Sequence, residues 1–392
     1  MIKSLKEFLK RRKRLYAFVR EFKKLKVERK FLWKDAVKQF EKKEYQNGTL
    51  KDYKKAMLRQ RFSYKEYVGY QLWNLRKDEI RIYISEQEMR CIYRKTVDTE
   101  TFKWFENKLM SHAKFAKFMQ RDWLCPSLCS FDSFRQFASS RDCIIKPWLG
   151  SLGQGVFMVK KDENNNLEEL YERCRKEGLI IEERVQSCHQ IAEFHPQSLN
   201  TIRVMTMSNG KRCELVAAEL RVGRGDSVVD NASVGGILCP IDTNNGIIVG
   251  DGKDKSGHVF VQHPDSGKTI KGFRIPYWEQ VVETCKKLTM IVPEVKIAGW
   301  DLCVCENGQI EMIEVNTCPN VMGLQMAFGV GLKPRIQALG KELLGYDLIQ
   351  LIHIYANPHI DCYERKQFLD YIANMEIQLK EYVDWLEKGQ RE

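Results

Sequence analysis

Three closely joined pairs of strand patterns limit the fold more than any other feature of this sequence. Residues 202–222 hold two apolar runs on either side of Asn209-Gly210, and residues 300–316 repeat the arrangement around a second Asn-Gly pair. Such pairs favour the tight turns that connect antiparallel strands. A glycine-rich loop joins the third pair, within residues 143–159. Antiparallel hairpins beside helical segments predict an α+β fold.

Helical patterns lie on both sides of these hairpins. In residues 1–105, apolar residues recur mostly at steps of three and four, as they do along one face of an amphipathic helix. The same reasoning predicts helices at residues 52–87, 102–121, 167–177, 277–290, 333–344 and 363–388.

Positive charge is concentrated in one basic arm. Residues 1–43 contain 17 Lys and Arg and 5 Asp and Glu, a surplus equal to the net charge of +12 for the whole chain. The remaining residues are neutral in sum, which disfavours a basic body that wraps nucleic acid. We expect the arm to contact an anionic membrane surface, where each Lys or Arg contributes on the order of 1 kcal/mol. A solvated helical lobe is the alternative, and RNA or an acidic protein would also attract the arm.

The sequence favours a cytoplasmic location. It contains no uncharged apolar run long enough to span a bilayer and no apolar segment typical of a signal peptide near residue 1. The 13 cysteines are an odd number in a long chain and show no paired zinc-type spacing, so we expect reduced structural thiols. The arm would place such a protein at the inner face of the membrane.

A lysine at the end of a predicted strand precedes the glycine-rich loop. Lys146 is followed by Gly150, Ser151, Gly153 and Gly155. Glycines let backbone N–H groups approach a polyphosphate closely, and an ammonium group compensates phosphate charge. The spacing matches neither the GxxxxGK[ST] phosphate loop nor the dinucleotide fingerprint, so a simple surface hairpin is the alternative.

Acidic side chains gather on the last predicted hairpin. Asp301 lies on one strand, and Glu314 and Asn316 lie two residues apart on the other strand, so these two share a strand face. Two carboxylates and an amide oxygen are ligands that suit Mg²⁺. Exposed hairpin acids are the alternative, but Glu314 stands in an apolar run, where an acid requires a reason.

An extended segment after another strand could contact a base. Glu182, Glu183 and Val185 end the strand predicted over residues 179–185. Backbone groups on such a segment can read an adenine edge, although this signal is weak when taken alone.

Two arginines lie on paired strands of the hairpin at residues 202–222. Arg203 and Arg221 could clamp a phosphate or a carboxylate through two hydrogen bonds each. Solvent-facing strand arginines are the alternative. Asn231 follows, ahead of Gly235-Gly236, and this stretch could supply a nest of hydrogen-bond donors.

Taken together, these residues resemble the ATP-grasp superfamily of carboxylate–amine ligases over about residues 105–345. Each motif alone is unspecific, whereas their joint order is specific. The pattern is most similar to the branch called sugar-transfer-associated ATP-grasp, found among bacterial surface-polysaccharide genes, and it is similar also to ribosomal-protein glutamate ligases. The matching positions, in chain order, are Lys146-Pro147, Gly150-Ser151, Glu182-Glu183, Val185, Arg203, Arg221, Asn231, Gly235-Gly236, Asp301, Glu314 and Asn316.

The resemblance implies four regions. A helical basic region, residues 1–104, precedes an ATP-grasp N-terminal subdomain with a glycine-rich lid, residues 105–190. An ATP-grasp C-terminal subdomain with the Mg²⁺ site follows at residues 191–350, and a helical tail at residues 351–392 ends the chain. Two α+β subdomains would thus clasp ATP.

The resemblance also implies how the nucleotide is bound. Lys146 and an earlier lysine would bind the phosphates under the glycine loop. Lys114 is our choice for the earlier lysine, with Lys117 and Lys108 as competitors. Adenine would be held by the segment from Glu182 to Val185, and ribose by His189 or Gln190, with Glu183 and Asn231 as further nucleotide contacts.

The remaining implied roles concern the reaction. Asp301, Glu314 and Asn316 would hold one or two Mg²⁺ ions, and Arg203 and Arg221 would lie near the γ-phosphate and the activated carboxyl. A carboxylate would attack ATP to give an acyl phosphate and ADP, and an amine would then displace phosphate.

The expected partners are therefore ATP, a carboxylate substrate and an amine acceptor, one of them glycan-linked if the role is surface-polysaccharide modification. An ATP-grasp kinase that phosphorylates its acceptor is one alternative, and a peptide- or protein-modifying ligase is another. A non-catalytic binding module is a third, against which the intact Lys146, Asp301 and Glu314 argue.

Overall fold

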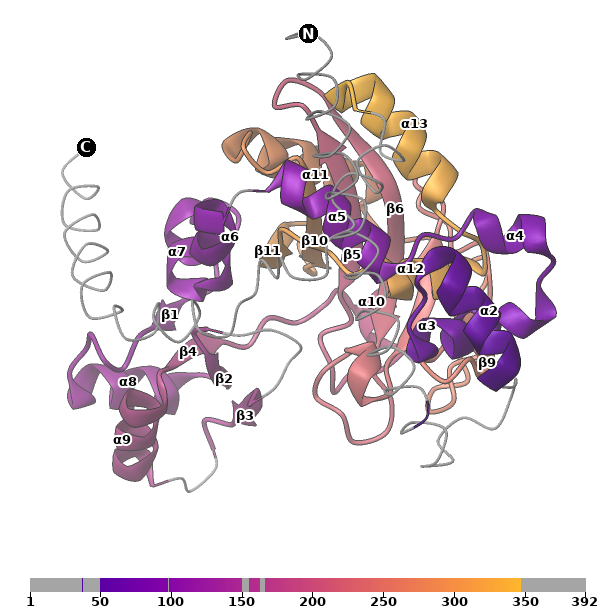
Figure 1. The fold of residues 1–392 in the computed structure, drawn as a ribbon. Helices are drawn as coiled ribbons and strands as arrows, with labels where there is room; N and C mark the ends of the chain where they lie inside the picture. Colours follow the sequence, from indigo (N-terminus) through magenta and orange to yellow (C-terminus); the bar gives the residue numbers. More distant parts are fainter. Residues whose placement is uncertain (1–36, 38–49, 98, 150–154, 163–165, 347–392) are drawn as a thin grey trace, which may run out of the picture. The chain divides into compact units, whose positions relative to one another are not determined.

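The computed structural model describes residue 37 and residues 50–97, 99–149, 155–162 and 166–346 (Figure 1). The chain divides into two compact units. One combines the residues up to Lys95 with those from Gly331 onward, and the other is Thr96–Val330. The domain boundaries predicted from the sequence stay predictions. Nearly all of the basic arm, residues 150–154 of the glycine loop and the helix predicted at 363–388 lie outside the described residues.

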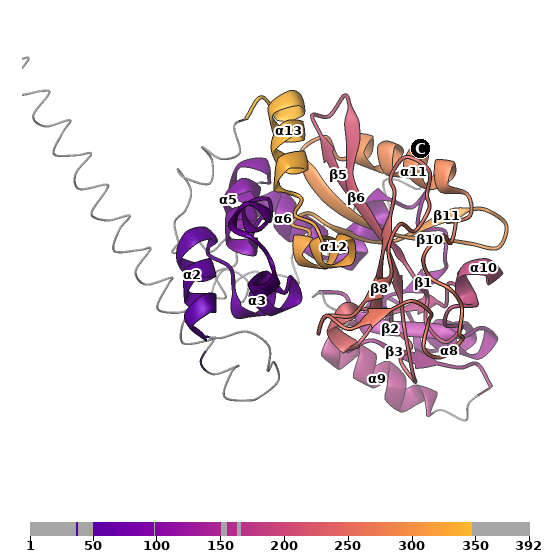
Figure 2. The ribbon, with the colours of Figure 1, turned by 90° about the vertical axis from the view of Figure 1, so that its right-hand side faces the viewer.

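The described part of the first unit is helical (Figure 2). The pattern predicted as helical over residues 52–87 is broken at Ser63, which begins a new helix: the Glu66 N–H donates to the Ser63 hydroxyl at 3.2 Å, and the Ser63 N–H donates to the Glu66 carboxylate at 2.7 Å. Lys333 pairs with Glu88 at 2.7 Å and ties the last helix of this unit to an earlier one. The helices are α2 (Leu50–Gln60), α3 (Tyr64–Gly69), η1 (Leu72–Asn74), α4 (Lys77–Arg81), α5 (Glu86–Thr96) and α13 (Lys333–Leu344).

The second unit contains two antiparallel sheets. The smaller sheet has the order β1-β4-β2-β3, and its strands are β1 (Trp123–Leu124), β2 (Cys143–Pro147), β3 (Phe157–Val159) and β4 (Leu179–Glu183). Helices α8 (Phe131–Ser140) and α9 (Leu167–Glu177) pack on this sheet (Figure 1). Phe134, Ile145 and Ile181 belong to the apolar core that joins them.

The larger sheet has the order β11-β10-β5-β6-β7-β8-β9. Side chains alternate between its two faces. Val204, Leu220 and Trp300 lie in the main apolar core with Val281 of α11, so their sequence neighbours point to the opposite face, where the site is built. The strands are β5 (Ile202–Ser208), β6 (Cys213–Val222), β7 (Ile237–Ile241), β8 (Gly252–Lys253), β9 (Val259–Phe260), β10 (Ile297–Val304) and β11 (Ile310–Asn316). The helices of this unit not yet given are α6 (Thr99–Glu106), α7 (Lys108–Lys114), α10 (His189–Ala192), η2 (Ala232–Val234), α11 (Trp278–Ile291) and α12 (Val321–Phe328).

A second predicted helix is also wrong in its extent. The helix expected over residues 102–121 is two helices, because the side chain of Asn107 accepts a hydrogen bond from the Leu109 N–H at 3.0 Å and begins α7. The three predicted hairpins are found as strand pairs. Among the described residues, no helix has both the length and the apolar character needed to cross a membrane.

Candidate functional site

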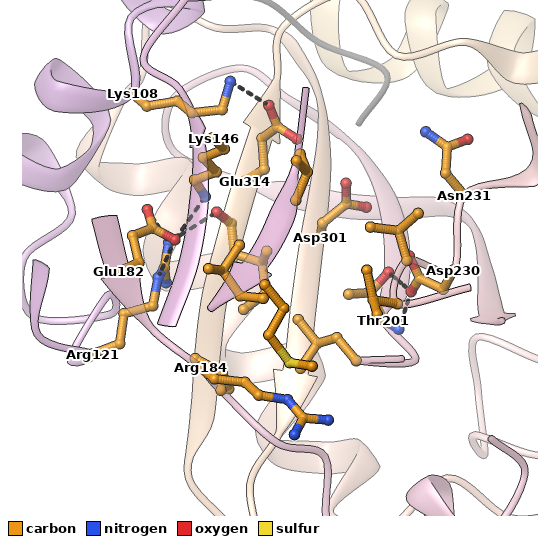
Figure 3. A pocket seen from close by; sticks show the side chains of 18 of the residues that line it. Lys108, Arg121, Lys146, Glu182, Arg184, Thr201, Asp230, Asn231, Asp301 and Glu314 are labelled. Atoms are coloured by element: carbon orange, nitrogen blue, oxygen red, sulfur yellow. Dashed lines mark hydrogen bonds and ion pairs between the residues drawn. The ribbon is translucent and has the colours of Figure 1, made fainter. Parts of the chain in front are cut away.

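A cavity of about 450 Å³ is lined by residues from both sheets of the second unit (Figure 3). Its apolar wall residues are Ile144, Leu149, Val156, Met158, Val185, Leu199, Val228, Val229 and Ile313. Its charged wall residues include Lys108, Arg121, Lys146, Glu182, Glu183, Arg184, Arg221, Asp230, Asp301 and Glu314. Such a wall suits a ligand that combines an apolar ring system with an anionic chain.

Lys146 reaches this cavity from β2. Its Nζ lies 2.7 Å from Oε2 of Glu182 on the neighbouring strand β4. Burial lowers the pKa of Lys146, although the charge of Glu182 opposes this shift. Burial alone would raise the pKa of Glu182, but Arg121 and Lys146 hold it well below its usual value. A charged carboxylate therefore fixes the position of this lysine.

Two further residues hold Glu182, and the sequence analysis missed both. Arg121 donates from Nε to Glu182 Oε2 at 2.9 Å and from Nη1 to Glu311 Oε1 on β11 at 2.8 Å, so it connects the two sheets. His112 Nε2 lies 2.6 Å from Glu182 Oε1. Burial lowers the pKa of His112 to about 4, although Glu182 raises it. The Glu182 carboxylate is thus committed to three side chains, and its contact with adenine stays a prediction.

Of the lysines considered for the earlier phosphate contact, Lys108 lines the cavity and Lys114 does not. Lys114 ends α7 with an exposed side chain and does not line the cavity. Lys108, the first residue of the same helix, does line it, and its Nζ lies 3.6 Å from Glu314 Oε1 (Figure 3). The helix start at Asn107 places Lys108 in the first turn of α7, at the cavity. Lys117 is exposed as well.

A row of charged residues crosses four strands of the larger sheet. Glu314 lies opposite Asp301, Asp301 opposite Arg203, and Arg203 opposite Glu219, so all four share one face. Arg203 donates to both oxygens of Asp301, from Nη2 at 2.6 Å and also from Nε. Burial alone would raise the pKa of Asp301, but Arg203 and Arg221 lower it. The predicted Asp301–Glu314 pairing is thus present.

The donor types of this row fit Mg²⁺. Among the described residues, no three His, Cys, Asp or Glu side chains form a metal-binding group, so the two carboxylates would need an amide oxygen as well. Asn316 is two residues from Glu314 on β11, and its Oδ1 accepts from the Cys318 N–H at 2.9 Å. Carboxylate and amide oxygens are ligands that Mg²⁺ accepts, usually together with water and phosphate.

The remaining predicted nucleotide residues divide into two groups. Glu183, Val185 and Asn231 line the cavity. His189 does not, because it is exposed at the start of α10, where its Nδ1 lies 2.7 Å from Glu306 Oε1. The cavity therefore gives no support to the ribose role of His189, which stays a prediction; its neighbour Gln190 does not line the cavity either.

Part of the glycine loop lies outside the described residues, namely Gly150, Ser151 and Gly153. Gly155 is described and has a left-handed backbone with φ of 71°, a conformation that favours glycine.

The loop after β6 holds a half-buried acid, Asp230, that the sequence analysis also missed. Asp230 Oδ2 accepts from the Thr201 N–H at 2.5 Å and from the Thr201 hydroxyl at 2.6 Å. Burial raises the pKa of Asp230, while Thr201 lowers it. Gly236 closes the same loop, because a Cβ there would lie 2.1 Å from the Asp230 carbonyl oxygen. The loop therefore presents Asn231 to the cavity in a fixed turn.

A second cavity of about 200 Å³ adjoins the first. The two share Arg221, Asn231, Asp301 and Glu314. The second is also lined by side chains that do not line the first, among them Glu106, Arg203, Glu219 and Asn316. Burial and the charge of Glu314 raise the pKa of Glu106, and Lys108 lowers it. Arg203 and Asn316 thus reach the second cavity rather than the first.

A protein-family model described as sugar-transfer associated ATP-grasp matches residues 94–341. Because this match spans more than half of the 392 residues, the chain belongs to the sugar-transfer-associated ATP-grasp family. The predicted resemblance and the α+β ATP-grasp fold class are confirmed.

Solved structures of ATP-grasp ligases are similar to the chain. One is ATP-grasp ligase PsnB complexed with minimal precursor, Mg and ADP, at 13% identity and a TM-score of 0.37, covering 67% of this chain and 61% of that one. The chain thus spans about three fifths of that protein. D-cycloserine synthetase DcsG shows 14% identity and a TM-score of 0.39, and the match covers 72% of this chain and 82% of that one. D-alanyl-alanine synthetase A from Vibrio cholerae O1 biovar eltor shows 12% identity and a TM-score of 0.37, and the match covers 64% of this chain and 65% of that one. A comparison with curated proteins gives no match.

Proposed function

We propose that this protein is an ADP-forming ligase that joins a carboxylate to an amine through an acyl phosphate, with ATP and Mg²⁺ as cofactors. The observation that carries this proposal is the meeting of Lys108, Lys146 and Arg221 in one cavity with Asp301 and Glu314. Three cations suit a polyphosphate chain, and the two carboxylates suit its metal ion. The PsnB ligase structure, which holds Mg and ADP, agrees with these cofactors.

The reaction proceeds in two steps. The substrate carboxylate attacks the γ-phosphorus of ATP, the bond to the β-phosphate oxygen breaks, and ADP leaves. The amine nitrogen then attacks the acyl carbon, phosphate leaves with the electron pair of the broken C–O bond, and the amine releases a proton. Lys146 and Arg221 compensate negative charge, and the apolar walls exclude water that would hydrolyse the acyl phosphate.

The metal-binding part of the proposal concerns three side chains. Asp301, Glu314 and Asn316 would hold Mg²⁺, which when bound compensates charge on the transferring phosphoryl group. Asp301 is held by Arg203, and Glu314 Oε1 lies 3.6 Å from Lys108 Nζ. Arg203 and Arg221 lower the pKa of Asp301, which favours its charged form.

We further propose that one of the two substrates is glycan-linked. The description of the family as sugar-transfer associated supports this role in surface-polysaccharide modification. Uronic acids and amino sugars are the glycan components that carry the required carboxylate and amine.

Lysine variants test the nucleotide site. Calorimetry with Mg-ATP should show affinity lowered roughly tenfold or more for Lys146→Met and Lys108→Met, because each loses a charge-assisted contact. Lys114→Met, at the other end of the helix that begins with Lys108, is the matched control and should bind as wild type. Weakened binding by the control with normal binding by Lys108→Met would reverse the assignment of the two lysines.

Trapping tests the reaction. Wild-type protein with ATP, Mg²⁺, hydroxylamine and a panel of uronic acids and amino acids should yield ADP and a hydroxamate, the product expected from an acyl phosphate. Formation of AMP would indicate adenylation instead. A stable phosphorylated acceptor would indicate a kinase.

A further inference from the structure

The second cavity contains a buried carboxylate oxygen that lacks a donor. Glu219 lies on β6 with 0% of its surface exposed, and it lines this cavity. Its Oε1 accepts from Arg221 Nε at 2.9 Å, whereas its Oε2 has no hydrogen-bond partner among the residues that the structure describes. A buried carboxylate oxygen without a donor is unfavourable, so its presence at a cavity indicates a ligand that donates to it.

A glycine in a helix lies against this carboxylate. Gly323 lies inside α12, a position where alanine is the more favourable residue. A Cβ at this position would lie 3.3 Å from Glu219 Oε1 and 3.4 Å from Oε2. A side chain here would therefore lie against both oxygens, and glycine leaves that space to the cavity.

The arginines around the cavity already have carboxylate partners. Both arginines are already engaged, since Arg203 binds Asp301, and Arg221 lies 2.9 Å from Glu219 and 3.6 Å from Asp301. The full set of charged lining residues is Glu106, Glu219, Asp301 and Glu314 against Arg203, Arg221 and Lys255. Asp301 and Glu314 are the carboxylates proposed to hold Mg²⁺, so Glu219 Oε2 is the acceptor that a cationic ligand in this cavity would satisfy.

We propose that the second cavity binds the amine substrate through a primary ammonium group, with Glu219 Oε2 as its acceptor. This inference rests on the proposed ligase function and adds the residue that selects the amine. The cavity is smaller than the roughly 300–1,000 Å³ of sites that enclose a whole ligand, so it takes the amine-bearing end. Because it shares Arg221, Asp301 and Glu314 with the first cavity, the ammonium group lies beside the phosphate-binding residues.

Ligand-detected NMR on the full chain tests the proposal with ethylammonium, ethanol and acetate as probes and Mg-ADP present throughout. We expect wild type to bind ethylammonium in preference to the other two. Glu219→Gln removes the charge and should weaken ethylammonium binding roughly tenfold or more. Gly323→Ala should weaken it as well. Glu214→Gln, on the same strand but outside the cavity, is the control and should bind as wild type.

The outcomes separate this inference from the proposed function. Calorimetry of Mg-ADP on the same samples comes first, and absence of nucleotide binding by wild type would contradict the proposed function itself. With normal nucleotide binding, equal ethylammonium affinity for wild type and Glu219→Gln overturns the inference alone. Preference for ethanol or acetate over ethylammonium does so too. Gly323→Ala keeps the carboxylate, so the test stands even if Glu219→Gln unfolds.

Discussion

Arg121 joins buried carboxylates on two sheets and carries the first prediction at the scale of single residues. Its guanidinium contacts Glu182 and Glu311, and all three side chains are at least 96% buried. Replacing Arg121 by Met would remove the guanidinium from both buried carboxylates. Removing one partner of a buried ion pair destabilises a protein by about 3–5 kcal/mol. We expect Arg121→Met to lower the free energy of unfolding by that order, measured by urea denaturation.

The control for this variant is an exposed arginine. Arg135 pairs with Asp132 at 2.9 Å, but their side chains are 60% and 81% exposed, so Arg135→Ala should change the free energy of unfolding by less than about 0.5 kcal/mol. Equal effects of the two substitutions would mean that Arg121 does not connect the sheets.

His112 gives the site a dependence on pH. Its pKa in the folded protein is lowered from 6.5 to about 4, chiefly by burial. In this window the unfolded chain binds a proton that the folded protein does not, so stability falls as the pH is lowered from 6.5 toward 4. The loss attributable to His112 is at most about 3 kcal/mol.

The His112→Gln variant isolates this effect because glutamine has no titrating group and can still donate to Glu182. Urea unfolding at several pH values across the window should show a shallower dependence for the variant than for wild type. Parallel curves would show that His112 titrates normally in the folded protein.

Residues of the candidate site could be predicted where a local sequence pattern indicates them. Lys146 precedes a glycine loop, and Glu314 is an acid in an apolar strand, and both line the cavity. Glu219 carries the same signal, since it lies between Ala218 and Leu220 on a buried strand, but it was overlooked. His189 follows the adenine segment in sequence, yet sequence proximity does not tell whether a helix start turns a side chain toward a cavity or away from it.

At the scale of elements, the start of α7 decides where Lys108 lies. Asn107→Ala would remove the acceptor of the Leu109 N–H, which costs about 1 kcal/mol of stability. Because Lys108 is the next residue, we also expect severalfold weaker Mg-ATP binding by calorimetry. Asn107→Asp keeps an oxygen acceptor and should restore both properties. Normal ATP binding by Asn107→Ala would contradict the expectation that the start of α7 positions Lys108 for the nucleotide.

Elements with local signals were predicted and those defined by tertiary packing were missed. The β5–β6 hairpin was predicted because Asn209-Gly210 marks its turn, and α9 because its pattern ends at Gly178, which has a left-handed backbone with φ of 66°. In contrast, β7 contains Pro240, a residue that argues against a strand. Its pairing with β6 forms between segments that no local pattern links.

At the scale of the whole molecule, the net charge lies in the basic arm and outside the residues that line the two cavities. Residues 1–43 hold the entire net charge, whereas both cavities are lined by residues between 105 and 326. We expect a chain without residues 1–43 to bind Mg-ATP as wild type and to lose binding to phosphatidylglycerol vesicles. That binding should weaken in the full chain as salt shortens the Debye length from about 10 Å at 0.1 M to about 3 Å at 1 M.

Two results would contradict this prediction. If the full chain ignores the vesicles at low salt, the arm does not dock on membranes. If the truncated chain aggregates or loses ATP binding, the arm is needed for the folded protein and is not a separate docking element.

The row of charges across the larger sheet has a consequence for the biosynthesis of the protein. Arg203 and its partner Asp301 are 98 residues apart, and the ribosome releases β5 and β6 long before β10 and β11. Until Asp301 has emerged, a nascent chain has Arg203 and Glu219 but neither of the carboxylates expected to hold the metal ion, and it lacks one of them until Glu314 has emerged. Domains fold as units during synthesis, so under the proposed function we expect nucleotide binding to begin only after β11 has left the ribosome.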